Sequence, residues 1–144
     1  MHQFHWEAIE RVKKRTDEPT IDAIIDVAEI VKTHNKIIRK YGGEKGILNR
    51  SELEFATGWV RSHPKKSVIW KAAILIRGIV CGHPFVDGNK RTGLAITEAL
   101  LDCYGYELVA PSDEVKEFVL SVAIEGWSVD RIVAWLKANV AKKR

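Results

Sequence analysis

Apolar residues recur at intervals of three and four along most of the chain, and this spacing places them on one face of an α-helix. Glycine and proline interrupt the pattern at a small number of points. The pattern predicts helices over residues 5–15, 20–41, 51–61, 67–82, 90–101, 112–125 and 128–140. A short extended or turn segment is expected around Gly105, over residues 104–109. We therefore expect an all-α fold of six or seven helices.

The helix expected at 67–82 carries apolar residues on nearly all of its faces, which indicates a central, buried position. The helix expected at 90–101 is also strongly apolar. The residues between these two helices should therefore form a loop that is held firmly at both ends. Such rigidity is what a catalytic or binding site requires of its scaffold.

Residues 42–50 contain three glycines and are expected to form a loop between two further helices. The helix before this loop should be capped by Thr20, and the helix after it should start at Ser51. The expected apolar stripe of the first helix consists of Ile21, Ile24, Ile25, Ala28 and Val31. The expected apolar positions of the second helix are Leu53, Phe55 and Ala56.

Residues 1–20 are expected to form an N-terminal extension, and residues 21–144 a single domain, because a turn-rich break follows the first short helix. The chain of 144 residues is long enough to bury a sizeable core. At the other end, the tail at 142–144 is expected to be solvated and frayed.

Net charge, cysteine spacing and hydropathy bear on the kind of ligand and the cellular location that we expect. The net charge of +4 suits an anionic substrate but does not by itself indicate nucleic-acid binding. Cys81 and Cys103 lack the spacing of a zinc or redox site, so buried free thiols are expected. The first twenty residues have no signal-peptide pattern, and no stretch is long and apolar enough for a membrane span. We expect a cytoplasmic protein.

The densest group of polar and charged side chains lies between the two most apolar helices, at residues 83–93, HPFVDGNKRTG. The proline after His83 disfavours a helical conformation there, so the preceding helix should end at or before this residue. Asp87-Gly88 is a typical turn pair. Asn89 is a good N-cap for the helix that follows.

This arrangement favours an anionic ligand. A helix N-terminus presents free backbone N–H groups and positive potential. Lys90 and Arg91 in the first helical turn oppose the helix dipole, and an anionic ligand would offset that cost. Asp87 offers the hard oxygen that Mg²⁺ takes beside substrate phosphates. His83, with an ordinary histidine pKa of about 6.5, suits a general base. Each residue alone is also common in a structural role, so the prediction depends on their combination.

The motif resembles the signature of the Fic/Doc family, His-Pro-Phe-x-Asp/Glu-Gly-Asn-Gly-Arg-x-x-Arg. Lys90 stands where the adenylylating branch has its second glycine, and Leu94 where that branch has its second arginine. Both differences resemble the Doc (death-on-curing) branch, His-x-Phe-x-Asp-Ala/Gly-Asn-Lys-Arg-Thr. The segment Tyr41-Gly42-Gly43, followed by Gly46-Ile47-Leu48, is similar to the Tyr-Gly-Gly segment of Doc-type proteins. The resemblance covers roughly residues 27–138.

The resemblance implies a Fic-like helical bundle in which residues 42–50 form a short extended flap that aligns the target protein. It also implies an ATP-dependent protein kinase of toxin type, which transfers phosphate to a Ser or Thr hydroxyl. In the Doc branch the target is a translation elongation factor, the outcome is growth arrest, and a small antitoxin is the partner. We expect no membrane or nucleic-acid partner.

The same resemblance assigns roles within the motif. His83 is expected to be the catalytic general base and Asp87 the ligand of Mg²⁺. The expected nucleotide- and phosphate-binding residues are Gly88, Asn89, Lys90 and Arg91.

Three alternatives remain open. Fic-type adenylyl transfer (AMPylation) would use the same base and metal but attack the α-phosphate of ATP. A non-catalytic nucleotide-binding or regulatory module would keep the pocket without the reaction. Nucleic-acid binding rests only on the net charge and the basic chain ends. The segment 121–126, SVAIEG, also matches the Ser/Thr-x-x-x-Glu-Gly inhibitory motif of some Fic proteins. We interpret that match as a coincidence inside a core helix, with Glu125 near the helix end.

Overall fold

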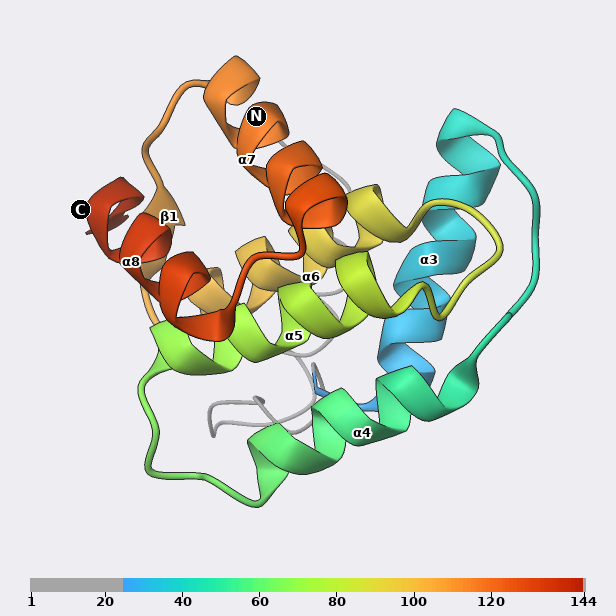
Figure 1. Cartoon of the computed structure of the whole chain (residues 1–144), viewed down its shortest axis with the longest axis horizontal. Helices are drawn as coiled ribbons and strands as arrows, with labels where there is room; N and C mark the ends of the chain where they lie inside the picture. The colour runs from blue at the N-terminus through green and yellow to red at the C-terminus, as the bar shows by residue number, and fades with distance from the viewer. Residues whose placement is uncertain (1–24, 144) are drawn as a thin grey trace.

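The computed structural model describes residues 25–143 of the chain. Its helices are α3 (Val27–Tyr41), α4 (Arg50–Arg61), α5 (Val68–Gly82), α6 (Asn89–Cys103), α7 (Ser112–Glu125) and α8 (Val129–Asn139) (Figure 1). Its strands are β1 (Tyr106–Leu108) and β2 (Val140–Lys142), which pair antiparallel. The all-α prediction is confirmed, since this small pair of strands is the only sheet within residues 25–143. None of the helices in that range is long and apolar enough to cross a membrane.

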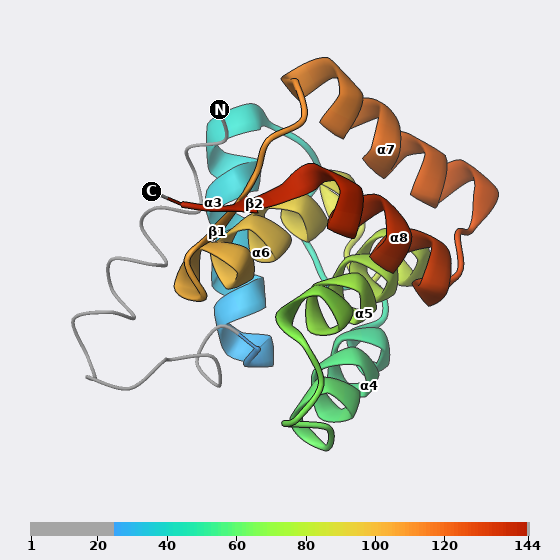
Figure 2. The same ribbon diagram turned by 90° about the vertical axis from the view of Figure 1, so that its left-hand side faces the viewer.

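Helix α5 lies in the middle of the molecule, with α4 along one side and α7 and α8 along the other (Figures 1 and 2). Helix α6 packs against α5, and α3 packs against α6. Several aliphatic side chains of α5 are fully buried, including Leu75, Ile76 and Ile79. The prediction that the helices on either side of the motif form the core is therefore confirmed.

Two glycines allow the central helices to approach closely. A Cβ atom at Gly93 would lie 2.7 Å from the Val80 side chain, so only glycine lets α6 come this near to α5. A Cβ atom at Gly78 would lie 2.8 Å from that of Ala56, which sets the spacing of α5 and α4 in the same way. The last residue of the predicted motif, Gly93, thus serves helix packing.

Helix α3 differs from its prediction. Within the described residues it begins at Val27, where the Asp26 carboxylate accepts a hydrogen bond from the Ala28 N–H at 3.1 Å. The predicted apolar stripe is wrong at Ala28, which is exposed. The buried face instead consists of Glu29, Ile30, Thr33, His34, Ile37 and Ile38. It contains polar residues because part of it packs against the motif loop rather than against another apolar helix.

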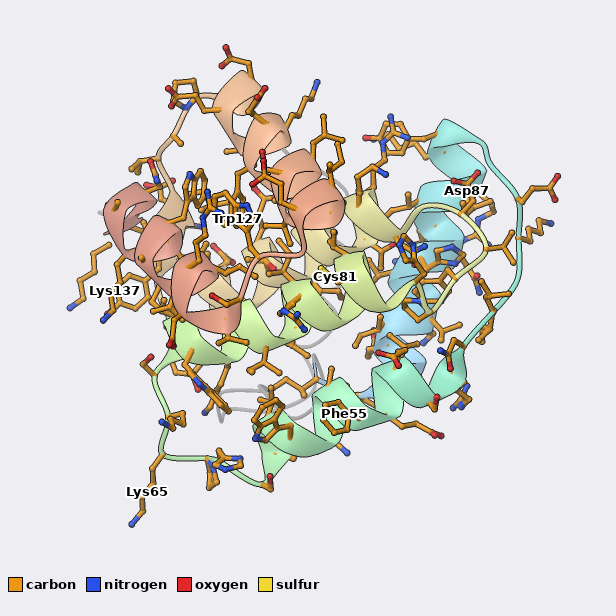
Figure 3. The ribbon with its side chains drawn as sticks, in the orientation of Figure 1. Phe55, Lys65, Cys81, Asp87, Trp127 and Lys137 are labelled. Carbon is orange, nitrogen blue, oxygen red and sulfur yellow. The ribbon has the colours of Figure 1, made fainter. Side chains whose placement is uncertain are left out.

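Helix α4 buries two of its three predicted apolar positions, Leu53 and Ala56, but not Phe55. Phe55 is 67% exposed, and its ring contacts Trp59 on the outer side of the helix (Figure 3). The face against α5 is made by Leu53, Ala56, Thr57 and Val60. Phe55 is apolar like Leu53 and Ala56, but its position around the helix axis points it away from α5.

The C-terminal residues were predicted to fray, but up to Lys143 they are ordered by pairing with β1 and its neighbours. Val140–Lys142 pairs with β1 in the register Tyr106↔Lys142, so the preceding helix ends at Asn139. The Lys143 N–H then donates to the Gly105 carbonyl at 2.8 Å, and the Lys143 ammonium pairs with Asp102. The tail satisfies backbone groups that β1 would otherwise leave unpaired. The extended segment predicted around Gly105 is confirmed.

Two further predictions concern the cysteines and the N-terminus. Neither Cys81 nor Cys103 forms a disulfide, as predicted, but both are half-buried where full burial was expected. Burial raises the pKa of the Cys81 thiol, and Arg77 opposes that shift. The predicted extension at residues 1–20 and the predicted cap at Thr20 lie outside the described residues.

Candidate active site

His83 is the C-cap of α5 and has a strained backbone. Its φ and ψ of 50° and 57° lie in the left-handed region, and no other non-glycine residue between 25 and 143 has a positive φ. This conformation costs an L-amino acid about 1–2 kcal/mol. Pro84 prevents the helix from continuing, so the predicted end of the helix is confirmed. The side chain is exposed, so the strained backbone holds an accessible imidazole at the end of a buried helix.

Asn89 closes the motif loop. Its amide oxygen accepts a hydrogen bond from the Phe85 N–H at 3.0 Å, and its amide nitrogen donates to the Phe85 carbonyl at 2.9 Å. Asn89 is itself the first residue of α6, and Gly88 occupies the N-cap position with a φ of 81°. The prediction that Asn89 caps this helix is therefore wrong. The buried Asn89 side chain hydrogen-bonds the backbone of Phe85 instead, because the loop turns back and brings Phe85 within reach.

Phe85 is completely buried and anchors the loop to α3. Its ring stacks on the imidazole of His34, with centroids 3.7 Å apart and planes 4° from parallel. The His34 Nε2 atom lies 2.7 Å from the Asp87 carbonyl oxygen. The sequence gives no indication that His34 supports the motif loop, because nothing in the local pattern separates it from other polar residues of a surface helix.

The glycine-rich loop between α3 and α4 runs beside the motif (Figure 1). The N–H groups of Leu48 and Asn49 donate to the Pro84 carbonyl at 2.8 and 3.0 Å. The Val86 N–H donates to the Gly46 carbonyl at 3.1 Å, and Ile47 forms an isolated bridge with Phe85. Residues 42–49 therefore form an extended segment held against the motif loop. Its use in aligning a target protein stays a prediction.

Asp87 lies on the exposed side of this loop pair (Figure 3). One carboxylate oxygen accepts the Gly88 N–H at 2.8 Å, and the other accepts the Glu44 N–H at 3.2 Å. A Cβ atom at Gly43 would lie 2.8 Å from the second oxygen, so glycine leaves room beside it. The carboxylate is thus oriented by two backbone donors and remains open to solvent.

The N-terminus of α6 has unused donors. The first hydrogen bond within the helix runs from the Thr92 N–H to the Gly88 carbonyl at 3.0 Å. The N–H groups of Asn89, Lys90 and Arg91 therefore have no acceptor inside the helix. No side chain caps this end, and its first turn contains no acidic residue. Lys90 and Arg91 are exposed. These are the features by which helix N-termini bind phosphate-sized anions, so this end of α6 is a candidate anion site.

A family model described as the Fic/DOC family matches residues 24–101, which is more than half of the chain. The chain belongs to the Fic/DOC family. The matched range contains the glycine-rich loop and the entire motif. The family resemblance stated from the sequence is therefore confirmed.

A second comparison concerns the branch of the Fic/DOC family. The protein named Toxin Doc of Mycolicibacterium smegmatis is 30% identical over 111 residues, which cover 70% of this chain and 83% of that protein. This similarity agrees with Lys90 and Leu94, the two residues that resemble the Doc branch. Leu94 is buried in the core.

Two further contacts bear on the family motifs. The guanidinium of Arg91 lies 4.5 Å from the ring centroid of Tyr41, which links the motif to the Tyr-Gly-Gly segment. Glu125, in the segment that matches the inhibitory motif, is the last residue of α7 as predicted. Its carboxylate accepts a hydrogen bond from the Trp127 indole at 2.8 Å and pairs with Arg131 at 3.6 Å.

The six predicted site residues lie together at the α5–α6 loop, but their surroundings differ. His83, Asp87, Lys90 and Arg91 are exposed, whereas the Asn89 side chain is buried. Within residues 25–143, no three His, Cys, Asp or Glu side chains gather as a metal site. A metal at Asp87 would need further ligands from a nucleotide and water. Mg²⁺ is commonly bound in this way, so the donor set fits that ion.

Proposed function

We propose that this protein is a Doc-type toxin that transfers the γ-phosphate of ATP to a Ser or Thr hydroxyl of a target protein. The observation that carries the proposal is the exposed, backbone-strained His83 beside the uncapped N-terminus of α6. A base and an anion site held on two buried helices are what phosphoryl transfer needs, because its catalysis is mostly positioning and charge stabilisation.

In the proposed reaction, the His83 imidazole takes the proton of the target hydroxyl as its oxygen attacks the γ-phosphorus. The bond from that phosphorus to the bridging oxygen breaks, and ADP leaves. The backbone N–H groups at the start of α6, with Lys90 and Arg91, stabilise the phosphate charge. Asp87 would hold Mg²⁺, which when bound neutralises phosphate oxygens. We assign the Asn89 side chain to holding the loop and not to the nucleotide.

The choice of kinase over adenylyltransferase is supported by two positions. Lys90 adds a side chain where the adenylylating branch has glycine, so the α-phosphate is less able to approach the backbone. Leu94 supplies no cation and is buried. As in the Doc branch, we propose a translation elongation factor as target, growth arrest as outcome, a small antitoxin as partner and the cytoplasm as location.

The test is a labelling assay in host-cell lysate, run in parallel with ATP labelled at the γ- and at the α-phosphate. We expect one protein band labelled from the γ-position alone. His83→Ala should lower the rate by about 10²–10⁴, and Asp87→Ala should remove the Mg²⁺ dependence of nucleotide binding. Label from the α-position would replace the proposal with adenylyl transfer. ATP binding without transfer to any target, including purified elongation factor, would favour the binding-module alternative.

A further inference from the structure

His34 is a nearly fully buried histidine outside the family motif. It comes from the middle of α3, 53 residues before Asp87 in the chain, and is 1% exposed. Its ring covers Phe85 on one side, and a Cβ atom at Gly88 would lie 3.5 Å from its Cδ2 and Nε2 atoms. The imidazole therefore lies directly behind the motif loop, where it contacts Phe85 and Asp87 and leaves little room for a side chain at position 88.

The contact with Asp87 determines which ring nitrogen carries hydrogen. A backbone carbonyl only accepts hydrogen bonds, so at 2.7 Å the His34 Nε2 atom must be the donor. The other ring nitrogen, Nδ1, lies 3.4 Å from the side-chain oxygen of Asn35, a contact at the limit of hydrogen bonding. The short bond to Asp87 is thus the strong, directional contact of this side chain.

This bond bears on the geometry of the site. The hydrogen bond from His34 restrains the peptide unit that follows Asp87. The carboxylate of the same residue accepts hydrogen bonds from the N–H groups of Gly88 and Glu44. The same peptide unit leads into Gly88 at the start of α6. A displacement of the Asp87 carbonyl would therefore shift both the exposed carboxylate and the anion site relative to His83.

We propose that His34 is a positioning residue, which donates from Nε2 to the Asp87 carbonyl and so orients the Asp87 carboxylate for Mg²⁺–nucleotide binding. It touches neither substrate nor metal. The proposal rests on the proposed function in so far as Asp87 serves a Mg²⁺-bound nucleotide. Groups that orient a metal ligand in this way commonly change metal affinity about 10–100-fold when they are replaced.

Two substitutions separate the hydrogen bond from the ring stack. His34→Phe keeps a flat ring against Phe85 and removes the donor, whereas His34→Gln keeps a side-chain donor and removes the ring. We expect His34→Phe to raise the Mg²⁺ concentration needed for half-maximal ATP binding by about 10–100-fold. His34→Gln should recover part of that loss. His63→Phe is the matched control, because His63 is exposed in the α4–α5 connection and contacts Trp59 and Trp70.

Calorimetry with Mg²⁺ and ATP, at several Mg²⁺ concentrations, measures the binding effect. A purely structural role would lower thermal stability in both His34 variants without a selective change in Mg²⁺ dependence. The proposal would be overturned if His34→Phe bound Mg²⁺ and ATP as tightly as the wild-type protein. It would also be overturned if His34→Gln bound them no more tightly than His34→Phe.

Nuclear magnetic resonance of the imidazole nitrogens gives a readout that does not depend on the proposed function. We expect hydrogen on the His34 Nε2 atom, and a shift of the Gly88 amide resonance in His34→Phe but not in His63→Phe. Hydrogen on Nδ1 alone, or an unmoved Gly88 resonance, would refute the positioning role even if the protein binds ATP. These expected spectra in a protein that binds no ATP would refute the proposed function and leave the loop geometry intact.

Discussion

Replacing Asn89 by serine distinguishes two roles for this residue of the motif, capping of α6 and closure of the loop on Phe85. Serine is about as good an N-cap as asparagine, so a capping role predicts a loss of less than about 0.5 kcal/mol. The structure instead shows the Asn89 amide bonded to both backbone groups of Phe85, at 3.0 and 2.9 Å. Serine is too short to make both bonds, so the two roles predict different stabilities.

The expected loss follows from the burial of these groups. Phe85 is completely buried, and its N–H and carbonyl would be left without their partner. A buried unsatisfied polar group costs about 1–3 kcal/mol, and partial access of water to the loop keeps the pair toward the lower end. We therefore expect Asn89→Ser to lower the free energy of unfolding by about 2–4 kcal/mol. For a domain of this size that is a fall in Tm of roughly 6–12 °C.

Urea and thermal unfolding measure this change, and Asn49→Ser is the matched control. Asn49 precedes α4, is exposed, and its side chain caps no N–H group of that helix. The control should change stability by no more than about 0.5 kcal/mol. If Asn89→Ser unfolds within that same margin of the wild-type protein, the clamp on Phe85 contributes nothing and the capping role returns.

Two further predictions concern strain and pH. His83→Gly should abolish transfer, because it removes the proposed base. It should also have a free energy of unfolding about 0.5–1 kcal/mol higher than that of His83→Ala, because glycine adopts a φ of 50° without the left-handed penalty. Equal stability of the two variants in urea would show that this backbone is not strained. Burial raises the pKa of Glu98 to about 8 from a usual value of 4.5, so the folded protein retains a proton that the unfolded chain releases. Stability should therefore fall as pH rises between these values, by at most about 1.4 kcal/mol per pH unit, and level off above about pH 8. Urea titrations across this range should show a shallower fall in Glu98→Gln, and an unchanged slope would contradict the assignment.

The position of the site follows from how the helices pack. The motif loop joins the two helices that form the core, and Gly93 lets those helices approach closely. The loop is then restrained on its outer side by the segment 42–49 and from behind by α3. The two core helices, the segment 42–49 and α3 keep the exposed side chains of this short loop in place without burying them, as the proposed reaction with a protein target would require.

Local signals in the sequence determined most of the elements. Ser67 and Ser128 were predicted as helix starts and are the caps of α5 and α8. The end of α5 at His83 followed from the proline after it. The six candidate site residues could also be proposed from the sequence, because the motif is contiguous and its residue types are distinctive. Periodicity, capping and proline act over a few residues, so one stretch of sequence contains all the information they need.

Tertiary structure decided how those elements support the site. The sequence contains no sign that Asn89 would bond Phe85 rather than cap its own helix. Neither does it indicate that His34 would reach the Asp87 carbonyl, or that Val140–Lys142 would pair with β1. In each case the partner is a backbone group, and every residue other than proline carries the same N–H and carbonyl. Which of these groups is near a given side chain depends on the path of the whole chain, so only the folded structure selects the pair.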